Sequence, residues 1–435
     1  MKNDSRRQFL LQSAALASAP WLADVVRAEE AARPDLPVGA KVGDMHVLPA
    51  TAQTTQWGWF DNAQPPVLRM RSGERVAMET QMAAANQVLP GVSIEEITQL
   101  RLAFPGRGPH TITGPIYIED AEPGDTLKIH IERIAPRSYG ANWNLPGSMG
   151  LGQFPERFPD GQVRYFYFDL KNASTEFAPG IRVPLRPFPG VLGVARAEPG
   201  RYSTVPPGPF GGNMDVREMV EGTTVYLPVF VEGALLWSGD SHAAQGNGEI
   251  NLTAIETAFN ELRLHVELIK GKPLTWPRIE TPTHWITVGY DRDLNKALDI
   301  LKTETQVFLA QTQNISPEKT EEMMATRFDC HIAEVVNQVK GVFCAIPKRA
   351  VKSTRGVRAP KENARYFVTS ASSPDLQTAM NEAAFAMIEQ LAERKGLSAI
   401  DAYALSSMTM DSVIGDISVG KKMVYCLVPK SLWNA

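Results

Sequence analysis

Thr224-Val-Tyr-Leu-Pro-Val-Phe-Val231 is followed by a turn at Glu232-Gly233 and by a second apolar run that continues through Trp237. Short runs of β-branched and aromatic residues joined by a glycine turn predict β-strands. Several similar runs alternate apolar and polar residues, as half-buried antiparallel strands do. These runs include Ile116–Ile118, Thr126–Ile131 and Val163–Phe168. We therefore expect residues 35–275 to form a β-rich domain, a sandwich of two antiparallel sheets that carries the active site.

Glycine and proline interrupt these runs throughout the first half of the chain. The sequence has 33 Gly and 32 Pro, and turn signals such as Glu122-Pro-Gly-Asp125 separate the predicted strands. The stretch from Pro179 to Gly212 is especially rich in both residues. We interpret it as a long loop system, and long loops within a compact domain are often functional.

The second half of the chain contains an internal repeat. A shift of 82 residues without a gap places Val342-Phe-Cys-Ala-Ile-Pro-Lys348 on Val424-Tyr-Cys-Leu-Val-Pro-Lys430, and Asp329 on Asp411. Each copy predicts a strand, a helix, a short helix and a strand, with long helices from Leu294 to about Thr312 and from Leu376 to about Lys395. A period this long indicates a duplicated α/β unit rather than a solenoid. Residues 283–435 then hold two copies, 283–349 and 365–431, and the whole chain is α+β and β-rich.

The amino terminus predicts export. Ser5-Arg-Arg-Gln-Phe-Leu10 matches a twin-arginine signal, and Val26-Arg-Ala28 offers small residues for cleavage after Ala28. We assign residues 1–28 to a signal peptide that engages the twin-arginine export machinery transiently. The mature protein is then expected in the periplasm or otherwise outside the inner membrane. No later apolar stretch reaches the length of a membrane span.

Charge and cysteine content exclude several classes of protein. The net charge is −4, with no long run of one sign, so no electrostatic footprint for nucleic acid or an anionic membrane is present. Three cysteines, Cys330, Cys344 and Cys426, allow at most one disulfide within the chain and lack zinc-finger spacing.

The densest group of chemically active side chains lies in Gly239-Asp-Ser-His-Ala-Ala-Gln-Gly-Asn-Gly-Glu249. Asp240 and His242 are two residues apart, so in an extended strand they point the same way. Such a pair can bind a metal or orient a proton carrier. Glu249 follows a glycine turn that can bring its carboxylate back toward His242, and Asp215 is a further oxygen donor.

Each of these residues also has a purely structural interpretation. Asp240 could be a turn residue, His242 a satisfied core histidine, and Glu249 the acid at the start of a helix over 251–262. The density of the group favours a site. A second candidate is His110, in a Gly/Pro loop before a predicted strand, where binding residues are often held.

The chain resembles the acetamidase/formamidase family. The resemblance lies in Thr113-Gly-Pro115, Ala121–Leu127, Gly212–Asp215, Tyr226–Val229 and the string Gly239–Glu249. It implies hydrolysis of short amides, a jelly-roll-like β-sandwich with α/β additions, and a homo-oligomer. The chain departs from the family string at Ser241, where Gly is usual, and at Asn247, where Asp is usual. The second change removes a carboxylate and leaves the substrate or metal preference open.

The resemblance and the side chains together predict an amidohydrolase that acts on a formamide- or acetamide-type substrate. Without a Gly-x-Ser-x-Gly elbow or a cysteine nucleophile motif, we expect an activated water. Glu249, His242 and Asp240 are the predicted catalytic residues. Asn213, Gln245 and His110 are assigned to substrate binding.

A cofactor is expected at the same place, and three alternatives stay open. The predicted ligands of one divalent ion, zinc or calcium, are Asp240, His242, Asp215 and His110. One alternative is metal-free general-base catalysis by Glu249. The others are an exported binding protein without catalysis and a hydrolase of cyclic amides.

Overall fold

The structure is a computed structural model that describes residues 38–349, 360–417 and 420–433. The predicted signal peptide, residues 1–28, lies outside it. None of the helices in these three ranges is long and apolar enough to cross a membrane.

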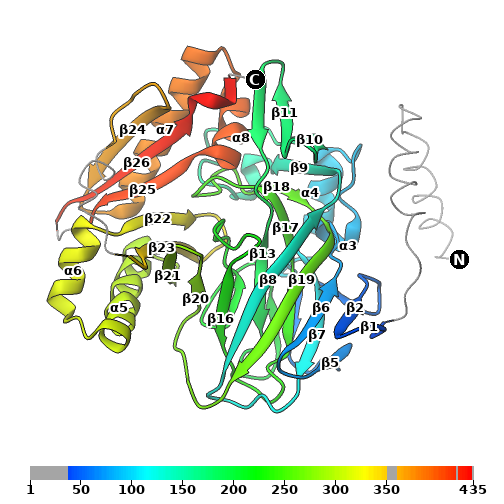
Figure 1. The fold of residues 1–435 in the computed structure, drawn as a ribbon. Coiled ribbons are helices and arrows are strands. Elements are labelled where there is room, and N and C mark those ends of the chain that lie inside the picture. Colours follow the sequence, from blue (N-terminus) through cyan, green and yellow to red (C-terminus); the bar gives the residue numbers. More distant parts are fainter. Residues whose placement is uncertain (1–37, 350–359, 418–419, 434–435) are drawn as a thin grey trace, which may run out of the picture.

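Two large sheets dominate the described residues, which confirms the expected β-rich α+β class (Figure 1). The first sheet has thirteen strands and is almost wholly antiparallel; β2 and β6 form a parallel pair. In spatial order its strands are β1 (Lys41–Val42), β2 (Met45–Leu48), β6 (Glu74–Met78), β19 (Phe259–Ile269), β8 (Thr126–Pro136), β16 (Thr224–Pro228), β20 (Arg278–Glu280), β21 (His284–Asp291), β23 (Lys340–Pro347), β22 (Asp329–Glu334), β25 (Asp411–Asp416), β26 (Lys422–Pro429) and β24 (Tyr366–Ser373).

The second sheet has eleven strands. Its main path is β12 (Ile181–Pro184), β11 (Ser174–Ala178), β10 (Gln162–Asp169), β9 (Tyr139–Asn144), β18 (Ile255–Thr257), β17 (Leu236–Ala244), β13 (Phe188–Val194) and β15 (Gly211–Asn213). Strand β7 (Thr111–Ile118) also pairs with β17, and it carries β3 (Thr55–Trp57) and β5 (Leu68–Met70). A separate pair joins β4 (Trp59–Asp61) to β14 (Arg201–Ser203).

Apolar side chains from both sheets form one core between them. Leu127, Ile129 and Ile131 alternate along β8 and are fully buried, and they share a cluster with Leu236 and Trp237 of β17. Burial of alternate residues is what a strand with one face on a core requires. The core therefore holds β17 rigidly, and β17 carries the centre of the candidate site.

The repeated region extends the first sheet instead of forming a sheet of its own. Its copies run β21, α5 (Leu294–Gln313), α6 (Pro317–Thr326), β22, β23 and β24, α7 (Leu376–Lys395), α8 (Ala399–Thr409), β25, β26. The long helices begin and end within one residue of the predicted limits. Each copy ends in two strands, however, where the sequence pattern indicated one. Asp329 and Asp411 begin the additional strands, β22 and β25.

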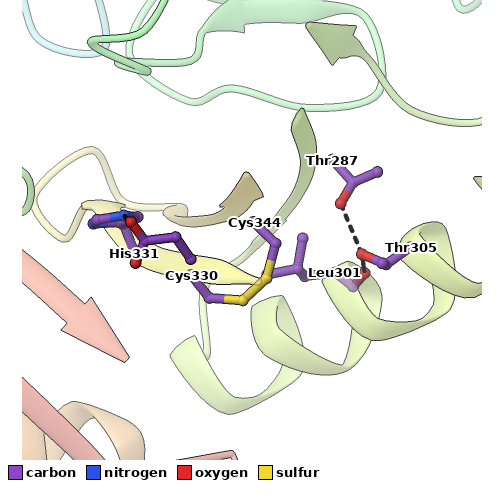
Figure 2. The surroundings of a disulfide bond; sticks show 7 residues. Thr287, Leu301, Thr305, Cys330, His331 and Cys344 are labelled. Atoms are coloured by element: carbon purple, nitrogen blue, oxygen red, sulfur yellow. Dashed lines mark hydrogen bonds and ion pairs between the residues drawn. A yellow bond between two sulfur atoms is a disulfide. The ribbon is translucent and has the colours of Figure 1, made fainter. Parts of the chain in front are cut away.

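A disulfide joins Cys330 of β22 to Cys344 of β23, which are paired residues on adjacent strands. Figure 2 shows the bridge lying over helix α5 near Leu301, beside the hydrogen bond between Thr287 and Thr305. The equivalent pair in the second copy is Ser412 and Cys426, which are also register partners. The repeat thus keeps the geometry of the pair but bridges it only in the first copy.

The predicted loop system at 179–212 is wrong in one respect, because it contains strands β12 to β15. Strand β13 lies between β17 and β15, and all seven of its residues are buried. A strand buried on both faces shows no alternation, and its two glycines and one proline obscured it further. The structural alternative of a helix over 251–262 is also wrong, because β18 and the start of β19 occupy that segment.

Three short helical segments complete the front half near the second sheet: α3 (Ala83–Asn86), α4 (Ile94–Ala103) and the 3-10 turn η1 (Gly147–Met149). A capping box formed by Ser93 and Glu96 fixes the start of α4. A further 3-10 turn, η2 (Lys430–Trp433), follows β26. Strands β13, β17 and β18 lie between the repeated region and helices α3 and α4 (Figure 1).

Candidate active site

Four acids and one histidine meet in the middle of the second sheet, and all five are buried. Asp240 and His242 come from β17 and Glu256 from the adjacent β18. Asp215 follows β15, and Glu249 lies in the turn after β17. Strands that are distant in sequence therefore supply the group, and three of its acids, Asp240, Glu249 and Glu256, line a cavity of about 90 Å³.

His242 is the hub of this group. Its Nδ1 lies 2.7 Å from Gln245 Oε1 and 3.7 Å from Asp215 Oδ1. Its Nε2 lies 3.3 Å from Glu256 Oε2 and 3.4 Å from Asp240 Oδ2, without a well-aligned hydrogen bond to either. The ring of Phe188 meets the imidazole edge-on at 5.1 Å and fixes its plane. The imidazole thus lies among three carboxylates.

Three of the acids have a left-handed backbone conformation. Asp215, Asp240 and Glu249 have φ values of 48°, 49° and 48°. Such left-handed conformations cost side-chain-bearing residues of order 1 kcal/mol or more each, and they cluster at functional sites. Asp240 is therefore not a regular strand residue, and the simple alternation expected for Asp240 and His242 does not explain their meeting. The strained turn of the backbone brings the two side chains together.

Burial and mutual repulsion shift the titration of the carboxyls. Burial raises the pKa of Asp215 to about 8 and that of Glu256 to about 7, against the attraction of His242. Burial and then the charge of Asp215 raise the pKa of Glu249 well above its ordinary value. Burial also opposes the charge of Asp240, yet His110 and His242 hold its pKa well below the usual range. The group carries more acid than its histidines can neutralise, so it binds protons or another cation.

The donor set fits a divalent metal ion. One ligand atom each from Asp215, Asp240 and His242 lie within 4.8 Å of one another, and the same holds for His242, Glu249 and Glu256. Asp215 Oδ1 and His242 Nε2 are buried without a hydrogen-bond partner among the described residues. Carboxylate oxygen and imidazole nitrogen together suit zinc and related divalent ions.

The other predicted residues lie around this group. His110 Nε2 is 3.6 Å from Asp240 Oδ2, while its Nδ1 faces Thr204, and burial lowers the pKa of the imidazole. His110 is not in either set of mutually close ligand atoms. Asn213 lines the cavity with a buried Oδ1 that has no hydrogen-bond partner within the described ranges. Gln245 instead holds His242, and it donates to the carbonyl of Asp215.

Two members of the site were not predicted from the sequence. Glu256 was hidden in the segment thought capable of forming a helix, where its position in a short strand had no alternation signal. Asn337 comes from the loop between β22 and β23, donates to Asp215 Oδ2 and lines the cavity. The first repeat copy therefore completes a site that the sequence places in the β-rich domain alone.

Asn247 points away from the acid group. Its Nδ2 donates to Asp411 Oδ1 at 2.7 Å and lies 3.3 Å from His331 Nδ1. An amide can donate there, whereas the carboxylate usual in the family would face Asp411 with like charge. The departure at Asn247 thus alters the contact with the second repeat copy rather than the acid group. Ser241 is also turned aside, 2.6 Å from Thr80 Oγ1.

Gly190 of β13 is the backbone wall of the site. A Cβ there would lie 2.7 Å from Asp215 Oδ1 and Asp240 Oδ2, and 2.8 Å from His242 Cε1. Its own φ is ordinary, so Gly190→Ala adds the contact without backbone strain. We expect kcat/KM to fall about 100-fold, because displacements near 1 Å at reacting groups cost that much. Steady-state kinetics together with the melting temperature test this; unchanged kinetics would contradict it.

The family assignment rests on the length of chain that is matched. The Acetamidase/Formamidase family model matches residues 44–201 and 196–435. The chain belongs to this family. The matched ranges include every residue of the acid group, so these side chains are part of an acetamidase/formamidase scaffold.

The chain is also similar to individual acetamidases and formamidases. An acetamidase from Mycolicibacterium smegmatis is 29% identical over 37% of this chain and 54% of its own length. A putative formamidase from Schizosaccharomyces pombe is 28% identical over 46% and 60%. The matched region thus spans little more than half of these relatives. The crystal structure of an acetamidase from Bacillus halodurans superposes with a TM-score of 0.63 at 30% identity, covering 69% of this chain and 97% of that one.

Proposed function

We propose that this protein is an amidohydrolase that cleaves a linear primary amide to a carboxylate and ammonia. The observation that carries the proposal is the meeting of three strained acids, Asp215, Asp240 and Glu249, around His242, with Asp240 and Glu249 lining a cavity. Strain of this kind is retained where geometry serves a ligand or a reaction. Family membership supplies the reaction class.

The cavity offers complementary partners for an amide group. Asn213 Oδ1, which has no hydrogen-bond partner among the described residues, accepts a hydrogen bond from the substrate N–H, since it is buried and lines the cavity. The His110 imidazole, whose pKa burial lowers, lies on the same lining and has Nδ1 facing Thr204. Its Nε2 lies 3.6 Å from Asp240 Oδ2, beside the acid group. Holding both in place lowers the entropic cost of reaction.

Glu249 is the proposed proton carrier. Its carboxyl lines the cavity, and burial with the charge of Asp215 raises its pKa well above the ordinary value, so it holds a proton more readily than a free glutamate does. Its ionised form accepts a proton from the attacking water, and the protonated form then returns that proton to the departing nitrogen. Gln245 and Phe188 hold the neighbouring His242 ring in place.

Asp215, Asp240 and His242 are the proposed ligands of a divalent ion, with zinc favoured by the nitrogen ligand. When bound, such an ion polarises a carbonyl group and lowers the pKa of water. The protein residues retain their roles around it: Asn337 orients Asp215, and Gln245 orients His242.

Export by the twin-arginine route is part of the same proposal. Its signal lies outside the described residues, but the Cys330–Cys344 disulfide supports it. Disulfides persist in oxidising compartments such as the periplasm and are rare in the cytosol.

The purified protein is expected to release ammonia from a primary amide and to contain about one divalent ion per chain, as judged by elemental analysis. Stripping the ion with a chelator should remove activity, and adding zinc should restore it. Full activity without any bound metal would favour general-base catalysis alone. Failure to hydrolyse acetamide or any larger amide would instead support a binding protein.

A further inference from the structure

We propose that the amide substrate carries an apolar acyl group well larger than acetyl, held in an apolar chamber next to the acid group. This inference rests on the proposed function and names its substrate class. It follows from the apolar lining of the cavity, from its volume, and from the contacts of the two arginines that line it.

The acid group contributes only Asp240, Glu249 and Glu256 to the cavity lining. Apolar side chains form much of the rest. From α4 come Ile97 and Leu100, and Phe104 follows that helix. Trp143, Leu145 and Leu252 line the cavity as well. Five of these six belong to, or pack against, a hydrophobic cluster separate from the core between the sheets. The cluster thus surrounds a space that an apolar ligand group fills favourably.

The volume exceeds what the smallest amides need. The cavity measures about 90 Å³. One water-sized position takes roughly 10–15 Å³ in this measure, so the cavity holds about six or more such positions. Acetamide, with four non-hydrogen atoms, occupies about four of these positions. The rest of the cavity would then hold water or stay empty. An acyl group with several further carbons displaces that water.

Two arginines also line the cavity, and both have partners within the lining. The Arg107 guanidinium lies 4.7 Å from the centre of the Trp57 ring and 5.0 Å from that of Phe104. Arg101 is held by a hydrogen bond to the carbonyl of Arg107. These contacts occupy the two arginines, which leaves the apolar side chains to select the acyl group.

The first test is a substrate series of acetamide, butyramide, 4-methylpentanamide and phenylacetamide, assayed by ammonia release. We expect kcat/KM to rise about fourfold for each added carbon until the chamber is full, as burial of a methylene group implies. A flat or falling series with active acetamide hydrolysis would overturn the apolar chamber and leave the amidase proposal standing.

Succinamate has the size and shape of 4-methylpentanamide but ends in a carboxylate. If the arginines bound substrate, succinamate would be preferred, and that result would also overturn the inference. We expect at least a tenfold preference for 4-methylpentanamide.

Calorimetric binding separates the apolar chamber from the proposed amidase activity. Phenylacetamide should bind at least tenfold more tightly than acetamide even if no amide is hydrolysed. Equal affinities would overturn the chamber.

A matched pair of variants on α4 provides the structural test. Leu100→Trp fills the chamber, whereas Leu102→Trp adds the same volume at a position that is 54% exposed. The ratio of kcat/KM for phenylacetamide over acetamide should fall at least tenfold in the first variant and stay within twofold of wild type in the second. Equal ratios in both variants, with both folded by their melting temperatures, would contradict the proposal.

Discussion

Glu249→Gln is expected to lower kcat/KM for amide hydrolysis about a thousandfold while leaving the fold intact. General acid–base catalysis contributes about 10²–10⁴ to an enzymatic rate. Glutamine keeps the size of the side chain but cannot carry the proton from water to nitrogen. The side chain is only 4% exposed, and the matched size of glutamine preserves the packing around it.

The control is a second buried glutamate far from the cavity. Glu304 of α5 is 7% exposed, accepts a hydrogen bond from Thr275, and does not line the cavity. Glu304→Gln should retain the wild-type rate. Ammonia release gives the rates, and calorimetry with an amide checks that the Glu249 variant still binds. A rate within threefold of wild type in Glu249→Gln would assign the proton transfer to another residue.

The sequence alone identified the residues that stand out in one dense segment, and Asp215 after Gly211-Gly-Asn213, but it missed Glu256 and Asn337. Asp240, His242 and Glu249 share one short segment, so their joint role could be anticipated. Glu256 lies 14 residues from His242 in the chain and reaches it only because β18 pairs with β17. Asn337 comes from a different half of the chain. Such convergence depends on strand order, which local patterns do not contain.

The fold shows the same division. Strand β8 was predictable because only one of its faces is buried along most of its length, which makes apolar and polar residues alternate. Strand β13 is buried on both faces, so its sequence shows no such alternation. The repeat predicted two equivalent units but not that their strands continue the first sheet. That continuation depends on the pairing of β20 with β16 and β21. It brings the loop of Asn337 to the cavity.

The contact between the repeat copies is the second place where one side chain has a large effect. Asp411 Oδ1 lies 2.9 Å from His331 Nδ1, and its Oδ2 lies 3.0 Å from Arg217 Nη2. Asn247 donates to the same carboxylate. Removing the charge leaves two cations with fewer partners in a buried setting. We expect Asp411→Asn to lower the free energy of unfolding by about 3 kcal/mol near pH 6.

The pH dependence identifies the interaction behind that loss. Burial lowers the pKa of His331, but Asp411 and Asp329 raise it overall from 6.5 to about 10. Because the pKa of His331 is raised in the folded state, its protonated imidazole contributes its full stabilisation below pH 6.5. This contribution declines as the pH rises toward 10. Without Asp411 the decline should be smaller, so the difference between variant and wild type narrows over this range. Urea unfolding at pH 6, 8 and 10 measures it. Asp299→Asn, at an exposed position on α5, is the control and should match wild type throughout. A difference that stays constant from pH 6 to pH 10 would show that the pair with His331 contributes nothing, and that packing or the pair with Arg217 stabilises this contact.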